Sequence, residues 1–525
     1  MAEKTHSKAS RTENSLRNVT CSIVAYVAKF AASFFFRMAF VRSLDNVYAG
    51  IDGLFSTVLY IISLVEMGYE VAMAYVLYRP IAEENYAEIR RIMLYYRSVS
   101  CWIAILILLL GMAVTPFLPQ IVGKLPDIPH IRWVFMAATL NMALEYLFKY
   151  RRTLICAMQK QYICTLAHYL AGAAMDLLQI LAVLLTRNYL LCLVLQGCGL
   201  LLEAVVEGLY IKRQFGREFW QRQRCGMEGI PISRQVRPYI HSVALHKAGT
   251  VLLSHGDVLL ISQLAGILQA GIYSNYKYII YALNSVYTLL MESVAAGIGE
   301  LGALEDKQKS RKVFSAVQLA GAWIYGFSAV CLYVLFNPFI ALWLGENSLF
   351  AEKIVVAIVL RFYVNGMKKA VSVYRDALGL FIHDRWIALA EFLLFFIFSF
   401  LLCNLGMGVE GVMYGSVLAA ACTSVWFEPL LLYRKGFAAP GAGQYFIMYM
   451  AFAGCTLGGC LLTKAAAQIL PWSGIAGFLC QIVMCIFIPN LLFWLCFGHT
   501  DGFRILQRKI GAYLHKSMKR ELVEK

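Results

Sequence analysis

The chain repeats one stretch: Tyr48-Ala-Gly-Ile-Asp-Gly-Leu-Phe-Ser-Thr-Val-Leu-Tyr-Ile-Ile62 has a counterpart in Gln269-Ala-Gly-Ile-Tyr-Ser-Asn-Tyr-Lys-Tyr-Ile-Ile280. An acidic and then basic segment follows each copy, Glu83–Arg91 after the first and Glu305–Lys312 after the second. The copies open the second and the eighth of the apolar stretches described next. The pattern therefore predicts two halves of six stretches each, with the same topology because six is even, related by an axis along the membrane normal.

Apolar stretches account for most of this chain of 525 residues, which is 60% hydrophobic with a mean hydropathy of +0.64. Each is long enough to cross a bilayer core as a helix, which takes roughly 20 residues. We therefore expect an all-α polytopic membrane protein with about 14 transmembrane helices. The stretches lie near 19–41, 51–78, 98–118, 131–148, 161–186, 188–211, 239–264, 269–299, 313–344, 353–372, 386–404, 409–433, 443–463 and 474–497.

Basic residues alternate along the chain. Most of the 47 Lys and Arg fall in the tails and in every second gap between the apolar stretches. This is the positive-inside bias repeated at each crossing, and it predicts that both termini are cytoplasmic in a plasma membrane. The net charge of +16 then reflects loops that face an anionic leaflet, so we expect no nucleic-acid partner. The cytoplasmic parts are a tail at 1–18, a basic linker at 212–238 and a basic tail at 498–525.

Five apolar stretches carry polar side chains at steps of three or four, which places them on one helical face. A charge at the middle of a span costs at least about 2.5–3.5 kcal/mol, so such stripes predict a shared wet cavity or a buried network. The stripes are Asn18, Ser22, Tyr26, Lys29, Ser33 and Arg37 in the first stretch; Ser56, Tyr60, Ser63, Glu66 and Glu70 in the second; His246, Thr250, Ser254 and Asp257 in the seventh; Ser274, Lys277, Tyr281, Ser285, Thr288 and Glu292 in the eighth; and Arg361, Asn365, Lys368, Ser372 and Arg375 in the tenth.

These stripes supply the candidate site residues. Basic groups suit an anion such as a phosphate or diphosphate, aromatic rings suit sugar rings, and carboxylates suit coupling to H⁺ or Na⁺. The alternative is that the charges neutralise one another, Lys29 and Arg37 against Glu66 and Glu70, and Lys247 or Lys277 against Asp257 or Glu292. We expect no catalytic residue, metal ligand or cofactor, since His and Cys form no ligand pattern. The candidates are Lys29, Arg37, Lys247, Lys277 and Arg361 for the anion, Tyr26, Tyr60, Tyr281 and Asn284 for the sugar, and Glu66, Glu70, Asp257 and Glu292 for coupling or charge pairing.

Several motifs carry a resemblance. They are Gly256-Asp-Val-Leu-Leu-Ile-Ser262, Phe362-Tyr-Val-Asn-Gly-Met367, Tyr374-Arg-Asp-Ala-Leu-Gly-Leu-Phe381 and Trp426-Phe-Glu-Pro429. With them the chain resembles the bacterial polysaccharide biosynthesis, or O-antigen flippase-like, transporters of the Gram-positive capsular or cell-wall type. These belong to the multidrug/oligosaccharidyl-lipid/polysaccharide exporter superfamily.

The resemblance implies a fold and a function. The fold would be two six-helix lobes, 19–211 and 239–433, forming a V around a central cavity, with two more helices in 434–497. The function would be movement of an undecaprenyl-diphosphate-linked oligosaccharide to the outer leaflet by alternating access, among membrane lipids and with polysaccharide-assembly proteins as possible partners.

Other functions stay open at this point. A lipid II flippase has a similar diphosphate lipid as its substrate. A cation-coupled multidrug exporter would need a mostly apolar cavity centred on carboxylates, against which the clustered Lys and Arg argue. A membrane polysaccharide polymerase or transferase usually needs a large outer loop, whereas the longest predicted outer gap is only Leu118–His130. We therefore expect a transporter rather than an enzyme.

Overall fold

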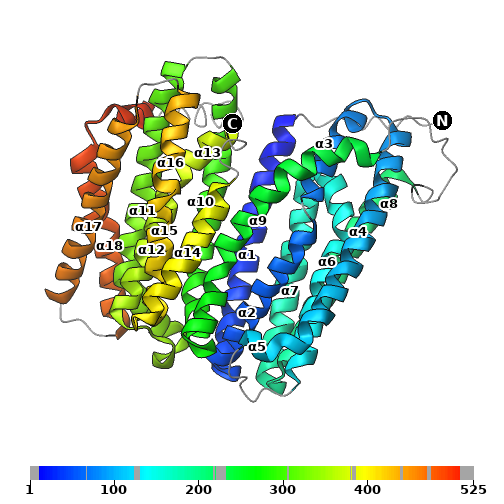
Figure 1. Ribbon diagram of the computed structural model, residues 1–525, viewed down its shortest axis with the longest axis horizontal. Coiled ribbons are helices and arrows are strands. Elements are labelled where there is room, and N and C mark those ends of the chain that lie inside the picture. Colours follow the sequence, from blue (N-terminus) through cyan, green and yellow to red (C-terminus); the bar gives the residue numbers. More distant parts are fainter. Residues whose placement is uncertain are drawn as a thin grey trace, which may run out of the picture. The chain divides into compact units, whose positions relative to one another are not determined.

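The computed structural model describes residues 11–66, 68–122, 130–216, 219, 232–303, 307–378, 380, 386–437, 441–469 and 474–508. Within these ranges every regular element is a helix and no strand occurs (Figure 1). The chain divides into two compact units, Met1–Gly271 and Ile272–Lys525, which we call the first unit and the second unit.

Helices follow one another closely in both units. The first unit holds α1 (Arg11–Leu44), α2 (Asn46–Ile62), α3 (Tyr69–Ala82), α4 (Tyr86–Val114), α5 (Leu118–Val122), α6 (Ile131–Ala157), α7 (Gln161–Thr186), α8 (Tyr189–Phe215) and α9 (Ile232–Leu264). Helix α10 (Ile267–Ala303) begins at the end of the first unit and continues into the second. The second unit holds α11 (Lys307–Leu344), α12 (Glu352–Met367), α13 (Lys369–Ala377), α14 (Ile387–Asn404), α15 (Gly408–Cys422), α16 (Ser424–Leu431), α17 (Gly443–Ile469) and α18 (Gly474–Phe497).

Each of the fourteen predicted apolar stretches coincides with helical structure, which confirms the all-α polytopic class. In the described part of the chain, ten helical segments are long and apolar enough to cross a membrane by length and composition. The predicted spans outside this set lie on α6, α9, α10 and α12–α13. Helix α12 has only 16 residues, α9 is apolar over the shorter stretch Ala248–Leu264, and α6 carries Lys149, Arg151 and Arg152, which lower its mean hydropathy.

Three predicted spans are interrupted rather than continuous. The second breaks after a 3-10 turn, Ser63–Glu66, where Gly68 takes a left-handed conformation with φ 78° that favours glycine. The tenth is interrupted at Lys368, between α12 and α13. The twelfth breaks at Thr423, between α15 and α16, where φ is −125° and ψ is −95°.

The two repeated Ala-Gly-Ile motifs pack directly against each other. A Cβ atom on Gly50 would stand 3.0 Å from the backbone nitrogen of Gly271, and closer still to the carbonyl oxygen of Ile267. A Cβ atom on Gly271 would stand 2.9 Å from the nitrogen of Gly50, and closer still to the carbonyl oxygen of Asn46. Gly50 thus faces the carbonyl of Ile267, four residues before Gly271, and Gly271 faces the carbonyl of Asn46, four residues before Gly50. Such close backbone crossing needs glycine on both helices, and it gives the repeat a local two-fold symmetry.

The outward faces of many helices are apolar. Leu181 and Leu185 on α7 are 57% and 82% exposed, and Phe487 on α18 is 68% exposed. Hydrocarbon is the solvent that suits such faces, since large contiguous apolar surfaces are rare on soluble proteins. Buried apolar clusters hold each unit together. One includes Met73, Ile92, Tyr96 and Leu154, and another includes Phe314, Tyr374, Leu432 and Tyr445.

The last two helices pack on α11 of the second unit. The Trp323 indole nitrogen donates to the side-chain oxygen of Asn490 at 2.7 Å, which joins α11 to α18. Lys464 on α17 forms an ion pair with Glu352 at the start of α12. Helices α17 and α18 are therefore an integral part of this unit.

The contact-based boundary between the units lies at Gly271, so α9 belongs to the first unit. The Thr57 hydroxyl on α2 lies 3.3 Å from the backbone oxygen of His255 on α9. The expected lobes 19–211 and 239–433, and the V between them, stay predictions. Much of the predicted linker 212–238, and the ends of both predicted tails, lie outside the described residues.

Candidate functional site

A cavity of about 560 Å³ lies inside the first unit, within the range of about 300–1,000 Å³ that is usual for small-molecule sites. Helices α2, α3, α6, α7 and α8 form its wall. Because the outer faces of α7 and α8 are apolar, the polar wall is a distinct internal environment. Its polar residues are Asp52, Ser56, Tyr60, Glu70, Asn141, Glu145, Lys149, Arg152, His168, Tyr189, Gln196, Glu203 and Glu207.

Ion pairs line this cavity. Lys149 on α6 lies 2.8 Å from Glu70 on α3. Glu203 on α8 contacts both Arg152, at 3.4 Å, and the ring nitrogen of His168, at 3.0 Å. Each of these cations has a carboxylate beside it, and the wall as a whole holds more carboxylates than Lys and Arg, so it is strongly polar and mainly acidic.

Glu207 differs from the other carboxylates of the wall. Its side chain is only 2% exposed, and its Oε1 atom has no hydrogen-bond partner among the described residues. It lies one helical turn after Glu203, and the guanidinium of neighbouring Arg151 donates to the backbone oxygen of Ala204 at 2.6 Å. A buried carboxylate oxygen without a hydrogen bond is energetically costly, which sets Glu207 apart from the ion-paired Glu70 and Glu203.

The stripe on α1 faces α7 and α2. Lys29 lies 2.6 Å from Asp176, which also accepts a hydrogen bond from Ser33 at 2.5 Å. Arg37 lies 3.5 Å from Asp52, and the Tyr189 hydroxyl donates to the same carboxylate at 2.7 Å. The stripe thus lies beside carboxylates on α7 and α2, in addition to the alternative pairing with Glu66 and Glu70 that the sequence suggested.

The second stripe is divided by the break at Gly68. Tyr60 stacks on His255 with ring centroids 4.0 Å apart. Glu66 is buried and accepts the backbone N–H of Glu70 at 2.7 Å, so it caps the first turn of α3. Tyr26 on α1 packs against Phe30 and Tyr169. Of these predicted residues, Tyr60 and Glu70 line the cavity.

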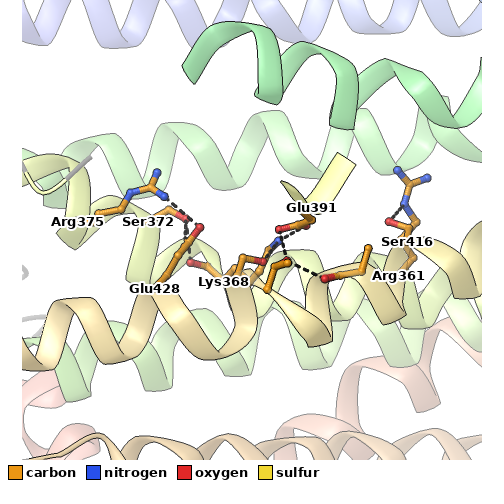
Figure 2. Close-up of polar contacts among 10 residues, drawn as sticks. Arg361, Lys368, Ser372, Arg375, Glu391, Ser416 and Glu428 are labelled. Atoms are coloured by element: carbon orange, nitrogen blue, oxygen red, sulfur yellow. Dashed lines mark hydrogen bonds and ion pairs between the residues drawn. The ribbon is translucent and has the colours of Figure 1, made fainter. Parts of the chain in front are cut away.

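A second polar network fills the second unit (Figure 2). Arg361 on α12 donates to the hydroxyls of Tyr273 and Ser416, at 2.8 and 3.1 Å. Lys368 lies 2.8 Å from Glu391 and 2.7 Å from the Ser424 hydroxyl. Further along, Arg375 lies 3.0 Å from Glu428, whose other oxygen is 3.4 Å from the Ser372 hydroxyl. Arg361, Lys368 and Arg375 recur every seventh residue, so they follow one face of α12 and α13.

The remaining predicted residues have varied surroundings. Asp257 is buried, and one of its oxygens accepts the backbone N–H of Val258 at 2.8 Å. Tyr281 is 70% exposed, and Asn284 lies 3.5 Å from the Tyr325 hydroxyl. Lys277 is half-buried on α10. The side chains of Lys247 on α9 and Glu292 on α10 lie outside the described residues.

Most ion-paired residues of the cavity were not predicted. Lys149 and Arg152 on α6 are three residues apart, and Glu203 and Glu207 on α8 are four residues apart. That spacing is the same signal that marks the other stripes, so it could have indicated these two pairs, whereas His168 stands alone on α7.

Comparison with known proteins finds neighbours among solved structures. No protein-family profile matches the chain, and no curated protein matches its sequence. Lipid II flippase MurJ in an inward closed conformation is 15% identical with a TM-score of 0.60, and the match covers 90% of this chain and 98% of MurJ. An inward-facing multidrug resistance MATE family transporter of the MOP superfamily is 12% identical with a TM-score of 0.58, covering 80% of this chain and 100% of that one.

A third neighbour agrees with these two. The MATE multidrug transporter DinF-BH is 14% identical with a TM-score of 0.57, covering 82% of this chain and 98% of its own. The chain shares its fold with these three solved structures. At identities this low the match establishes the fold alone. It leaves the function and the substrate to be argued from the site.

Proposed function

We propose that this protein is a flippase that moves an undecaprenyl-diphosphate-linked oligosaccharide from the cytoplasmic to the outer leaflet, for export of a surface polysaccharide. The observation that carries this proposal is the polar cavity of about 560 Å³ inside a unit whose outer faces are apolar. A sugar head group loses its hydrogen bonds in hydrocarbon, which is costly, whereas a prenyl chain is at home there. The cavity would hold the head group while the units alternate between inward and outward access.

The chemistry of the wall suits a sugar. The amides of Asn141 and Gln196 and the phenol of Tyr60 offer both donors and acceptors to hydroxyl groups. Lys149 and Arg152 already have carboxylate partners, so this wall favours the sugars over the diphosphate. For the diphosphate we propose the basic residues expected from sequence, Lys29, Arg37, Lys247, Lys277 and Arg361, with Tyr26, Tyr281 and Asn284 as further contacts to the head group.

A multidrug exporter and a lipid II flippase are the rival functions. A hydrophobic cation is best held by an apolar wall with one carboxylate. This wall instead contains amides, hydroxyls, several carboxylates and basic side chains. A lipid II flippase differs from the proposed function only in the glycan that it carries. The fold supports all three, and the polar cavity favours the two glycan carriers.

Transport against a gradient needs an energy source, which we propose to be H⁺ or Na⁺. Glu207 adds to the coupling candidates Glu66, Glu70, Asp257 and Glu292, because one of its buried oxygens lacks a hydrogen bond. We place the protein in the plasma membrane with both termini cytoplasmic, and expect membrane lipids and polysaccharide-assembly proteins as its neighbours.

Depletion of the protein in its host tests the proposal. The lipid-linked oligosaccharides would be identified by mass spectrometry and their leaflet determined with a membrane-impermeant probe. A complete diphosphate-linked repeat should accumulate on the cytoplasmic side, and its composition would distinguish a surface polysaccharide from lipid II. Unchanged lipid-linked oligosaccharides with normal surface glycan would refute the proposal.

Complementation adds residue resolution to this test. Arg152→Gln removes a cation from the cavity wall, whereas Arg79→Gln removes one whose side chain is 86% exposed on α3. The first variant should fail to restore export while still inserting in the membrane, and the second should restore it. Equal export by both variants would remove the cavity from the proposed pathway.

A further inference from the structure

We propose that the ammonium of Lys368 occupies a monovalent-cation site of the second unit, and that its removal leaves a site for a small dissolved cation such as Na⁺ or methylammonium. The proposal rests on the contacts of Lys368 and does not depend on the function proposed above. It concerns a site in which the chain supplies both the oxygen ligands and the cation that fills it.

The oxygen atoms around the Lys368 ammonium come from two helices, α14 and α16. Oε1 of Glu391 on α14 lies 2.8 Å from the Lys368 nitrogen, and the Ser424 hydroxyl at the start of α16 lies 2.7 Å from it. Oε2 of the same carboxylate lies 3.3 Å from the Thr423 hydroxyl. Figure 2 shows Lys368 reaching toward Glu391 from the junction between α12 and α13. Carboxylate and hydroxyl oxygens such as those of Glu391 and Ser424 are ligands that hard cations prefer, and the Thr423 hydroxyl supports the carboxylate from its other oxygen.

The site lies where two helices are interrupted. Helix α12 ends at Met367, directly before Lys368, and helix α15 ends at Cys422, directly before Thr423 and Ser424. The carbonyl groups at a helix C-terminus carry partial negative charge and lack intrahelical donors. In membrane transporters, interrupted helices of this kind coordinate Na⁺ through such carbonyls. Here Lys368 itself follows one such helix end, and Ser424 lies two residues after the other.

Burial separates this site from an ordinary surface ion pair. The side chains of Lys368 and Glu391 are 17% and 7% exposed. A carboxylate this deep in an apolar unit requires a cation beside it, because an uncompensated buried charge is strongly destabilising. Arg79 and Glu83 form an ion pair of the same length, 2.8 Å, but their side chains are 86% and 51% exposed. That pair lies near solvent and provides a matched control.

The native protein therefore needs no dissolved ion at this position. A lysine tethered to α12 cannot diffuse away, so the ion pair joins α12 to α14 and α16 in any salt. It follows that an ion that couples to transport must bind elsewhere, for which Glu207 in the first unit is available.

The test measures the apparent Tm of purified protein in detergent, with sodium, methylammonium or choline as the sole cation. Choline is too large for a site shaped around one ammonium. Lys368→Ala should lose several degrees of Tm in choline and regain most of them in sodium or methylammonium. The wild type and Arg79→Ala should have the same Tm in all three salts. In Lys368→Ala/Glu391→Gln, which has no charge at the site, the response to sodium and methylammonium should vanish.

Three outcomes would overturn the proposal. One is a Tm of Lys368→Ala that is the same in all three salts. Another is a wild-type Tm that rises with sodium and ceases to do so in Glu391→Gln, which would mean that a dissolved cation binds beside the lysine. The third is a Lys368→Ala protein that folds in none of these cations while Lys368→Ala/Glu391→Gln does fold.

Discussion

Replacing Gly271 by alanine tests the crossing of the two repeated motifs. The new Cβ atom would stand 2.8 Å from the carbonyl carbon of Asn46 and 2.9 Å from the nitrogen of Gly50, whereas ordinary contact begins at 3.4 Å. The Asn46 oxygen would be closer still, and all three are backbone atoms that no side-chain rotation can move away. The helices must therefore separate by more than about half an ångström, and overpacking of this kind costs about 1–3 kcal/mol.

The assay is the apparent Tm of the purified protein in detergent, measured beside glycosylated-lipid export in cells. Gly454→Ala on α17 is the matched control, since a Cβ atom there meets nothing within 4 Å. The control should be neutral or slightly stabilising, because alanine favours a helix over glycine by about 0.5–1 kcal/mol. Gly271→Ala should lower both Tm and export.

Gly50→Ala sharpens the test through a double-mutant cycle. Both substitutions separate the same pair of helices, so the second should cost much less once the first is present. Additive losses of Tm, or a Gly271→Ala protein as stable as Gly454→Ala, would refute the reasoning from the crossing.

Two further predictions concern ion pairs. Lys29→Met should destabilise the first unit by about 3–5 kcal/mol, because it leaves the buried carboxylate of Asp176 without its cation. Lys29→Met/Asp176→Leu should recover most of the loss in apparent Tm. A double variant less stable than the single one would contradict this. At the start of α12, hydrogen bonds from Lys464 and Tyr333 hold the pKa of Glu352 below its usual value of 4.5. A carboxylate whose pKa is lower in the folded than in the unfolded protein contributes stability at pH values above its unfolded pKa. That contribution is lost as the pH falls through its folded pKa. Glu352→Gln should therefore lower the apparent Tm slightly at pH 7, but not at a pH near the pKa of Glu352 in the folded protein. Salt should reduce the Tm difference at pH 7, because this ion pair is exposed. An equal loss of Tm at both pH values would count against the prediction.

Sequence alone was sufficient for the fold class. Hydrophobic runs of bilayer length and alternating basic gaps depend only on the local chain, and each predicted run contains a helix. Helix breaks were harder to predict. Gly68 is a visible signal, but the break at Thr423 and the interruption at Lys368 are stabilised by Glu391, which lies on another helix.

The candidate site was only partly predicted, since Tyr60 and Glu70 line the cavity but most of its ion-paired residues were not among the predicted ones. Periodicity shows that Lys29 and Arg37 share a face of α1, since that follows from 3.6 residues per turn. It does not show which helix the face meets, and the partners turned out to be Asp176 and Asp52. The repeat likewise marked Gly50 and Gly271 as equivalent, but only the tertiary structure brought them into contact. Helix formation in a membrane is dictated within each segment by backbone hydrogen bonding, whereas the choice of neighbouring helix depends on packing and charge pairing between residues distant in sequence.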